Sequence, residues 1–224
     1  MILQKIFDKT RRLTNTTTVT LPDARLLDLT NETYLDIQRR LAQEEIEVFG
    51  TVKKTDLMVG QPNYQLPIDM LTILRVEVNY DDPTDNTKWV KVNQTDLANL
   101  PFEFYNLLQS QPKSKPLMDL FASQIFLFPQ ATATQVNGIR LWYIPRQPEF
   151  TSMSDELPAI LKNYWEVFAY GNAFRYFEEI GHPEANRKLE LYEAFIQKMI
   201  DDLRVETIEP IKVQTVDYFN QGWL

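Results

Sequence analysis

Residues 138–204 constrain the fold most strongly, because they combine a strand, a proline exit and two consecutive helices. Aromatic and β-branched side chains predict a strand at 138–144, and Pro145 ends it because proline has no N–H for the ladder. Apolar residues cover nearly the whole circumference of 157–180, which predicts a helix buried on several sides. The Gly-His-Pro break at 181–183 ends this helix.

The second helix of this hairpin is predicted at 184–204, where apolar residues recur in steps of four and three. The residues on this face are Ala185, Leu189, Tyr192, Ile196, Met199 and Leu203. Polar and charged residues occupy the opposite face, so we expect an amphipathic helix that lies outside its partner. The hairpin is interpreted as structural.

The first fifty residues predict further helical structure. Residues 23–45 show the spacing of an amphipathic helix, and 2–13 fit a short helix that precedes a threonine-rich loop. The pattern leaves open whether residues up to 21 form a helix, an arm or a loose end.

Between these helical regions the hydrophobic period changes from 3.6 to 2, which predicts a small antiparallel sheet or sandwich. Proline and glycine separate the short β-rich runs, as expected for turns. The runs before the strand at 138–144 are 51–59, 63–66, 73–80, 88–92, 117–121 and 124–128.

The predicted fold class is therefore α+β, with three parts. A discontinuous antiparallel helical bundle comprises residues 1–50 and 151–204. An antiparallel β-rich domain, 51–150, is inserted into it, and 205–224 form an extended C-terminal arm. The β-rich part is an insertion because the buried helix at 157–180 needs the early helix as a neighbour.

Composition argues against several classes of function. The net charge of −8 gives no electrostatic basis for wrapping nucleic acid, which requires a footprint rich in lysine and arginine. The absence of cysteine removes disulfides, thiolate catalysis and cysteine-ligated metals. Six scattered glycines form no phosphate-binding loop. The only histidine, His182, is interpreted as a solvent-facing turn residue.

No catalytic, cofactor-binding or metal-binding residue is predicted, and we expect a protein that is not an enzyme. Paired carboxylates such as Asp81 with Asp82 and Asp155 with Glu156 are interpreted as turn polarity or helix-end charge. No apolar run approaches the roughly 20 residues that span a bilayer, and no signal peptide is seen, so no membrane association is expected.

The last segment, 205–224, is too apolar for a solvated tail, and we predict that it binds a partner. The candidate contact residues are Ile211, Val213, Val216, Tyr218, Phe219, Trp223 and Leu224. The competing interpretation is that this segment packs back on its own domain as a last strand.

Several weak marks together resemble the head-to-tail adaptor proteins of tailed bacteriophages. They are the helix sequence at 34–44, the Tyr-Gln-Leu-Pro run that opens 64–71, Leu-Trp-Tyr-Ile-Pro at 141–145 and Ser-Asp-Glu-Leu-Pro at 154–158. The likeness covers roughly 22–204.

The resemblance implies a structural virion protein, made in the host cytoplasm and located in the neck between capsid and tail. It implies a homo-oligomeric ring, usually a dodecamer, that binds the portal protein and tail (nozzle or tube) proteins. DNA would pass through the ring without specific binding, which the acidic net charge permits. The alternatives are a tail tube or nozzle subunit and, less favoured, a carbohydrate-active enzyme with two facing carboxylates.

Overall fold

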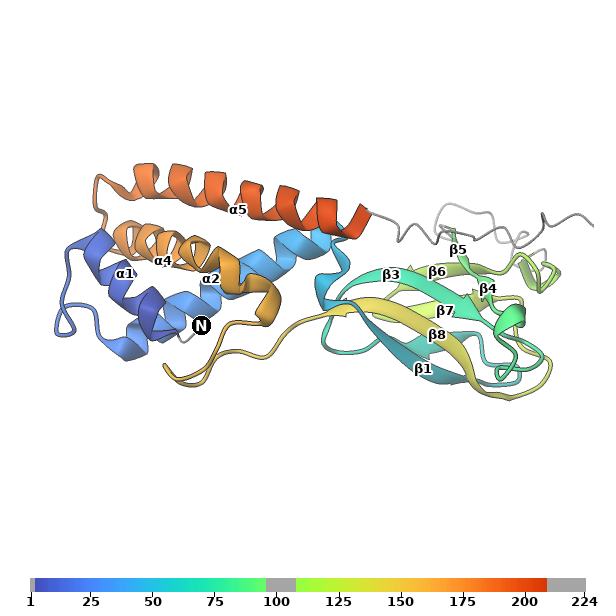
Figure 1. The fold of residues 1–224 in the computed structure, drawn as a ribbon. Helices are drawn as coiled ribbons and strands as arrows, with labels where there is room; N and C mark the ends of the chain where they lie inside the picture. Colours follow the sequence, from blue (N-terminus) through green and yellow to red (C-terminus); the bar gives the residue numbers. More distant parts are fainter. Residues whose placement is uncertain (1–2, 96–107, 209–224) are drawn as a thin grey trace, which may run out of the picture.

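The computed structural model describes residues 3–95 and 108–208 of the chain. Helices gather at one end of the molecule and strands at the other, so the predicted α+β class is confirmed (Figure 1). No helix within these described ranges is long and apolar enough to cross a membrane.

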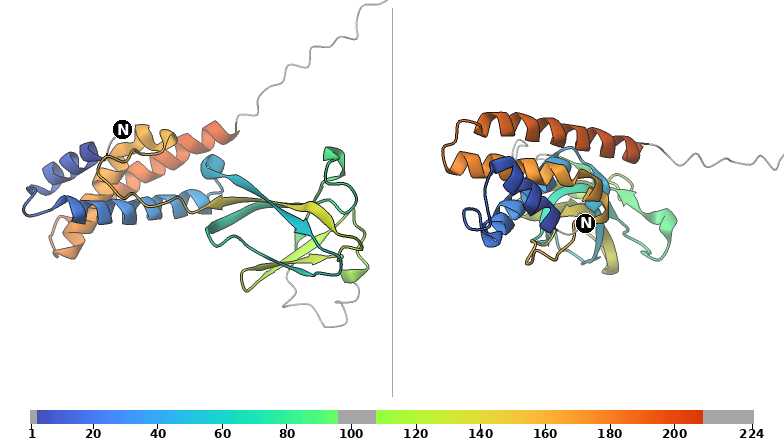
Figure 2. Two further views of the ribbon diagram at one scale, coloured as in Figure 1. Left: turned by 90° about the horizontal axis from the view of Figure 1, so that it is seen from below. Right: turned by 60° about the vertical axis from the view of Figure 1, so that its left-hand side comes forward.

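Four described α-helices and two 3₁₀ segments build the helical layer. In chain order they are α1 (Gln4–Thr14), α2 (Asp23–Gln43), η1 (Glu47–Phe49), η4 (Ala159–Tyr164), α4 (Trp165–Glu179) and α5 (Ala185–Ile208). Both α1 and α2 pack on α4, and α5 packs on the same helix (Figures 1 and 2). Phe7, Ile37, Phe168 and Ile196 are fully buried in one core cluster, so both ends of the chain contribute to it.

The N-terminal residues belong to this core. Ile6 and Phe7 of α1 are fully buried, and Leu21 follows before α2 begins. Asn15 ends α1 in the left-handed conformation, with φ of 53°, which asparagine tolerates. Arg11 then donates two hydrogen bonds to the Leu21 carbonyl, at 3.1 and 3.0 Å, which closes the loop. The open question about residues up to 21 is therefore answered for 3–21.

The helix predicted to start near residue 157 begins differently. Pro158 has an extended ψ of 142°, and the chain first forms the 3₁₀ segment η4 before α4 starts at Trp165. Asp155 accepts hydrogen bonds from the N–H groups of Thr151 and Ser152, at 2.7 and 3.0 Å. It therefore caps its own turn and does not cap the helix. At the other end of the hairpin, α5 continues to Ile208, past the predicted end at 204.

The strands form two four-stranded sheets. The strands are β1 (Thr51–Leu57), β2 (Asn63–Gln65), β3 (Met70–Val78), β4 (Val90–Lys91), β5 (Asn93–Gln94), β6 (Leu117–Phe121), β7 (Gln124–Phe128) and β8 (Gln135–Pro145). The short 3₁₀ segment η2 (Asn86–Lys88) precedes β4. The sheet orders are β1-β8-β3-β4 and β2-β7-β6-β5. All pairs are antiparallel except β5 with β6, which is parallel, so the prediction of a purely antiparallel arrangement is wrong at this one edge.

The two sheets enclose a second core. Val76 and Val78 of β3 lie opposite Leu141 and Ile139 of β8, and all four side chains are buried. They share one cluster with buried residues of the other sheet, among them Ile125. The alternation of these residues with exposed ones is what a sheet with one covered face requires.

Candidate functional site

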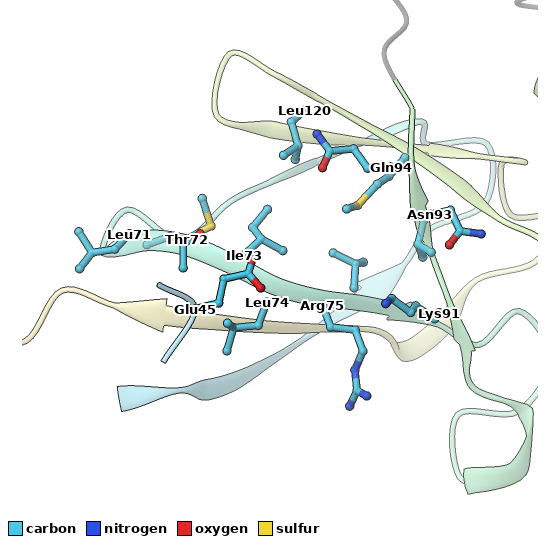
Figure 3. A pocket seen from close by; sticks show the side chains of 14 residues that line it. Glu45, Leu71, Thr72, Ile73, Leu74, Arg75, Lys91, Asn93, Gln94 and Leu120 are labelled. Atoms are coloured by element: carbon cyan, nitrogen blue, oxygen red, sulfur yellow. The ribbon is translucent and has the colours of Figure 1, made fainter. Parts of the chain in front are cut away.

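A groove lies beside β3, and we call it the β3-edge groove (Figure 3). It encloses about 580 Å³ between β3 on one wall and β5 and β6 on the other. In Figure 3, Ile73 points from β3 toward Leu120 and Gln94 on the opposite wall, while Leu74 and Arg75 point to the other side of the strand. The groove is therefore an opening along one side of the sandwich.

Among the described strands, none pairs with the first part of β3 on the side of this groove. The neighbouring strand β4 pairs only with Glu77 and Val78, and the Val92 N–H donates to the Val76 carbonyl at 2.9 Å. Along the strand from Met70 to Arg75, β8 is the only described strand that pairs with β3. An edge of this kind offers backbone groups to an added strand.

The side chains of this edge are apolar. Met70, Leu71, Ile73 and Leu74 are all half-buried, and no charged residue occurs before Arg75. The opposite edge of the same sheet is β1, which carries the adjacent exposed residues 53 and 54, both lysine. Lysine on an edge strand opposes pairing with other chains. The sheet therefore protects one edge with charge and leaves an apolar stretch on the other.

Two exposed apolar residues lie close in sequence to residues that line the groove. Ile68, in the loop before β3, is fully exposed, and Phe121, the last residue of β6 before its turn, is 69% exposed. The loop and the turn are joined, because the Leu66 N–H donates to the Ser123 carbonyl at 3.1 Å. Apolar surface of this extent beside a groove is typical of an interaction site.

The carboxylate of Glu45 and the ammonium group of Lys91 line the groove. Glu45, which follows α2 with a positive φ of 54°, lies beside Ile73 and Leu74, and Lys91 lies on β4 (Figure 3). Within the described ranges, neither side chain forms an ion pair. Arg75, between them, is already engaged, since it lies 3.4 Å from Glu77 and stacks over the Trp142 ring at 4.8 Å.

The groove also reaches the helical layer. A second cavity, of about 260 Å³, shares Leu71 and Thr72 and is lined by Arg39, Ala42 and Gln43 of α2. Next to this junction, the Arg204 guanidinium of α5 bonds to the carboxylate of Glu44. This ion pair holds α5 next to the residue that precedes Glu45 in the chain.

The seven residues predicted to bind a partner all lie outside the described residues. They are Ile211, Val213, Val216, Tyr218, Phe219, Trp223 and Leu224. Sequence reasoning placed the contacts only there and missed the β3-edge groove. The apolar residues Met70, Leu71, Ile73 and Leu74, interrupted only by a threonine, were the available signal, but such a run does not reveal which side of a strand lacks a neighbour.

The other residues considered for chemistry have structural roles. His182 is exposed in the turn between α4 and α5, where it stacks on Phe177 with ring centres 4.3 Å apart. Its Nδ1 accepts a hydrogen bond from the Glu184 N–H at 3.2 Å. In another turn the Asp82 N–H donates to Asn79 Oδ1 at 2.9 Å. The hydroxyl and the N–H of Thr84 both donate to the Asp82 carboxylate, at 2.6 and 3.0 Å, which lowers the pKa of Asp82. No group of three or more histidine, aspartate or glutamate side chains is arranged to hold a metal in the described ranges.

An exposed apolar groove with an open strand edge is a feature of proteins that bind other protein chains. Comparison with protein families agrees, because residues 1–215 match the family described as SU10 adaptor protein. The chain therefore belongs to this family of bacteriophage head-to-tail adaptors, and the resemblance seen in the sequence is confirmed. The family is one of structural connectors in the neck of the virion, which associate with portal and tail proteins. A search of curated proteins finds no match.

Proposed function

We propose that this adaptor assembles as a homo-oligomeric ring, a dodecamer, that joins the portal vertex of the capsid to the tail. The observation that carries this proposal is the family match over residues 1–215. DNA passes through the lumen of the ring during genome ejection. The net charge of −8 suits this role, because a surface without a strong basic footprint does not hold the phosphates of passing DNA. The protein acts without catalysis.

In this proposal the chain has three working parts. The helical bundle of residues 1–50 and 151–204 is the frame, and the β-rich domain of 51–150 is inserted into it. The observation that supports this division is the presence of two separate buried clusters, one among the helices and one among the strands. Residues 205–224 include the arm, which starts after α5 ends at Ile208.

We assign the main contacts to the arm, through Ile211, Val213, Val216, Tyr218, Phe219, Trp223 and Leu224. These residues bind the portal or a neighbouring subunit. These seven apolar residues lie within 211–224, and binding to a partner surface would bury their side chains.

Native mass spectrometry of the full chain mixed with its portal protein tests the ring. A complex with many adaptor copies on one portal is the expected result, and monodisperse monomer both alone and with portal would refute the proposal. Deletion of 209–224 keeps α5 whole and tests the arm. The matched control is Lys53→Ala on the exposed strand β1, which should leave portal binding unchanged. Equal binding by the deletion and the control would exclude the arm as a contact.

A further inference from the structure

We propose that the outer face of the first sheet binds an extended acidic segment of another protein, with carboxylates at alternate positions. We call this surface the cationic sheet face and define it by Lys54 of β1, Arg140 and Trp142 of β8, and Arg75 of β3. Arg75 points to the other side of β3 from Ile73 (Figure 3). The inference goes beyond the proposed ring and the arm and does not depend on either.

Strand register brings these side chains onto one face. Lys54 lies opposite Arg140, and Arg75 lies opposite Trp142. Opposite residues of an antiparallel pair share a face, and so do residues two apart on one strand, so β8 joins the two pairs. The alternate positions carry side chains that are buried between the two sheets, such as Leu141. In Figure 1, β1, β8 and β3 lie in front of β7, and no described α-helix covers them.

Arg140 gives the strongest indication of an anionic ligand. Its half-buried guanidinium stacks over the Trp89 ring at 3.7 Å, and no described carboxylate forms an ion pair with it. Among the described residues only Asn86 accepts a hydrogen bond from it, at 3.0 Å, and its buried Nε has no partner. Stacking on an indole offsets only part of the cost of a half-buried cation without a counterion. A carboxylate from a partner would supply the bidentate bond that a guanidinium prefers.

The carboxylate nearest to Arg140 in register is engaged elsewhere. Glu77 lies opposite Arg140, but one of its oxygens accepts a hydrogen bond from Trp142 Nε1 at 3.2 Å. The other oxygen lies 3.4 Å from Arg75 Nε. Glu77 therefore fixes Arg75 and Trp142 in place and leaves Arg140 without a counterion.

Lys54 is the second cation of this face without a counterion. It is exposed, and no described carboxylate pairs with it. Asp56, further along β1, accepts a hydrogen bond from the Asn137 N–H at 2.7 Å. Lys54 and Arg140 thus stand side by side and uncompensated in a protein whose net charge is −8. This local reversal of charge suits an acidic partner.

The spacing of the cations fits an extended segment that crosses the strands. Opposite residues lie about 5 Å apart and diagonal ones about 7–8 Å, so these are the steps from Arg140 to Lys54 and from Arg140 to Arg75. Alternate residues of an extended chain are about 6.7 Å apart and point to the same side. Long side chains absorb the difference. Three carboxylates at alternate positions would therefore reach Lys54, Arg140 and Arg75 in turn.

A protein segment is favoured over nucleic acid by the small size of the face. Three cations contact about three phosphates, fewer than the roughly 6–10 contacts of a strongly salt-dependent DNA-binding protein. The acidic remainder of the chain repels a long polyanion. Arg75 stacks over the Trp142 ring at 4.8 Å and Arg140 over the Trp89 ring, so each indole has a ring face occupied that a base would need.

Fluorescence anisotropy with labelled twelve-residue peptides tests this inference on the full chain. The first peptide alternates glutamate with threonine, and the second has the same composition but with paired glutamates and paired threonines. The third has glutamine in place of glutamate, and single-stranded oligo-dT of equal length is the nucleic-acid probe. Protein is titrated to about 1 mM, because three partly exposed ion pairs give weak affinity.

We expect the alternating peptide to bind about fivefold more tightly than the paired one, and its affinity to fall as salt is added. The glutamine peptide and oligo-dT should not bind. Lys54→Gln should weaken binding of the alternating peptide about two- to fivefold, as for an exposed ion pair. Lys53→Gln is the matched control, because Lys53 is an equally charged, exposed neighbour that lies opposite the buried Leu141 and hence on the other face. It should leave binding unchanged.

Arg140→Lys tests the guanidinium itself. The change keeps the charge but removes the planar fork, and it should weaken binding about fivefold. Thermal unfolding of each variant checks that it is folded, and the exposed position of Lys54 keeps the test decisive if Arg140→Lys is unstable.

Three results would overturn the inference. They are no binding of the alternating peptide by the folded protein, equal effects of Lys53→Gln and Lys54→Gln, and equal affinity for the two acidic peptides. Tighter binding of oligo-dT than of the alternating peptide would assign the face to nucleic acid and also overturn it. All these measurements use the free protein, so a failure to form a ring on the portal would refute the proposed function and leave this result unaffected.

Discussion

Replacing Gly171 with alanine tests how closely the helices from the two ends of the chain are packed. Gly171 lies in the middle of α4, where a Cβ atom would stand 2.6 Å from Thr33 Cγ2 on α2 and 3.0 Å from Tyr192 Cε2 on α5. The first distance is shorter than any ordinary carbon contact, so a backbone or a side chain must shift. Alanine would therefore overpack the point where three helices meet.

The magnitude follows from two opposing terms. Alanine gains about 1 kcal/mol of helix propensity over glycine, whereas overpacking a core costs about 1–3 kcal/mol. We expect a net loss of about 1 kcal/mol in the free energy of unfolding, which for a chain of this size lowers Tm by about 2–4 °C. Thr33→Ser removes the methyl group that clashes and keeps the hydroxyl, which lies 3.0 Å from the Asn172 amide. By itself it should also cost about 1 kcal/mol.

A double-mutant cycle read by thermal and urea unfolding separates these effects. The variant with both Gly171→Ala and Thr33→Ser should be at least about 1 kcal/mol more stable than the sum of the single losses, because the new methyl fills the space of the old one. Thr30→Ser is the matched control, since it also shortens a buried threonine of α2 near Asn172. Its combination with Gly171→Ala should be additive. An increase in Tm from Gly171→Ala alone, or additivity with Thr33→Ser, would refute the packing argument.

Three further predictions concern the helical layer. Phe7→Ala should lower the free energy of unfolding by about 3–5 kcal/mol in urea titrations, because Phe7 is fully buried. A loss below about 0.5 kcal/mol, as for a surface residue, would contradict the packing of α1 in the core. Arg40→Met breaks hydrogen bonds of 2.6 and 2.7 Å to the two carboxylate oxygens of Glu193. The free energy of unfolding should fall by only about 1 kcal/mol or less, because both side chains are part-exposed. The resulting difference in Tm should become smaller at high salt, and a difference that grows with salt would contradict an ionic interaction. Two backbone N–H groups hold the pKa of Asp155 below its ordinary value of 3.8, so the carboxylate stabilises the fold above that pH and the effect is lost as the pH falls through the lowered pKa. Asp155→Ala should thus reduce Tm at about pH 6 and converge with the unchanged protein below that pKa, and a constant difference would show that ionisation is irrelevant.

The spacing of apolar residues correctly predicted those helices and strands that bury one face. The four-three spacing in 184–204 predicted the face of α5 on which Tyr192, Ile196 and Met199 are buried. Likewise β6 and β7 have the bounds expected from their β-rich runs, because Pro116 directly precedes the first run and Pro129 directly follows the second. In these elements the hydrophobic period is fixed by the geometry of the helix or strand itself.

The sequence pattern did not predict the backbone conformation where side-chain hydrogen bonds determine it. The start of the helical hairpin was predicted near residue 157, but Asp155 bonds to its own turn and the chain enters α4 only after η4. The position of residues 3–21 also depends on the hydrogen bonds from the Arg11 side chain to the Leu21 carbonyl, and the spacing of apolar residues does not predict such bonds. Burial of Phe7 then follows from the partner helix α4.

The sequence by itself determined the helical hairpin, the order of the strands along the chain and the absence of cysteine chemistry, because these depend on residue type and near-neighbour spacing. Only the tertiary structure decided that β3 has β8 on one side and, along its first residues, no described strand on the other. Strand order within a sheet is set by which apolar faces meet in three dimensions, so the β3-edge groove could not be read from the run at 70–74.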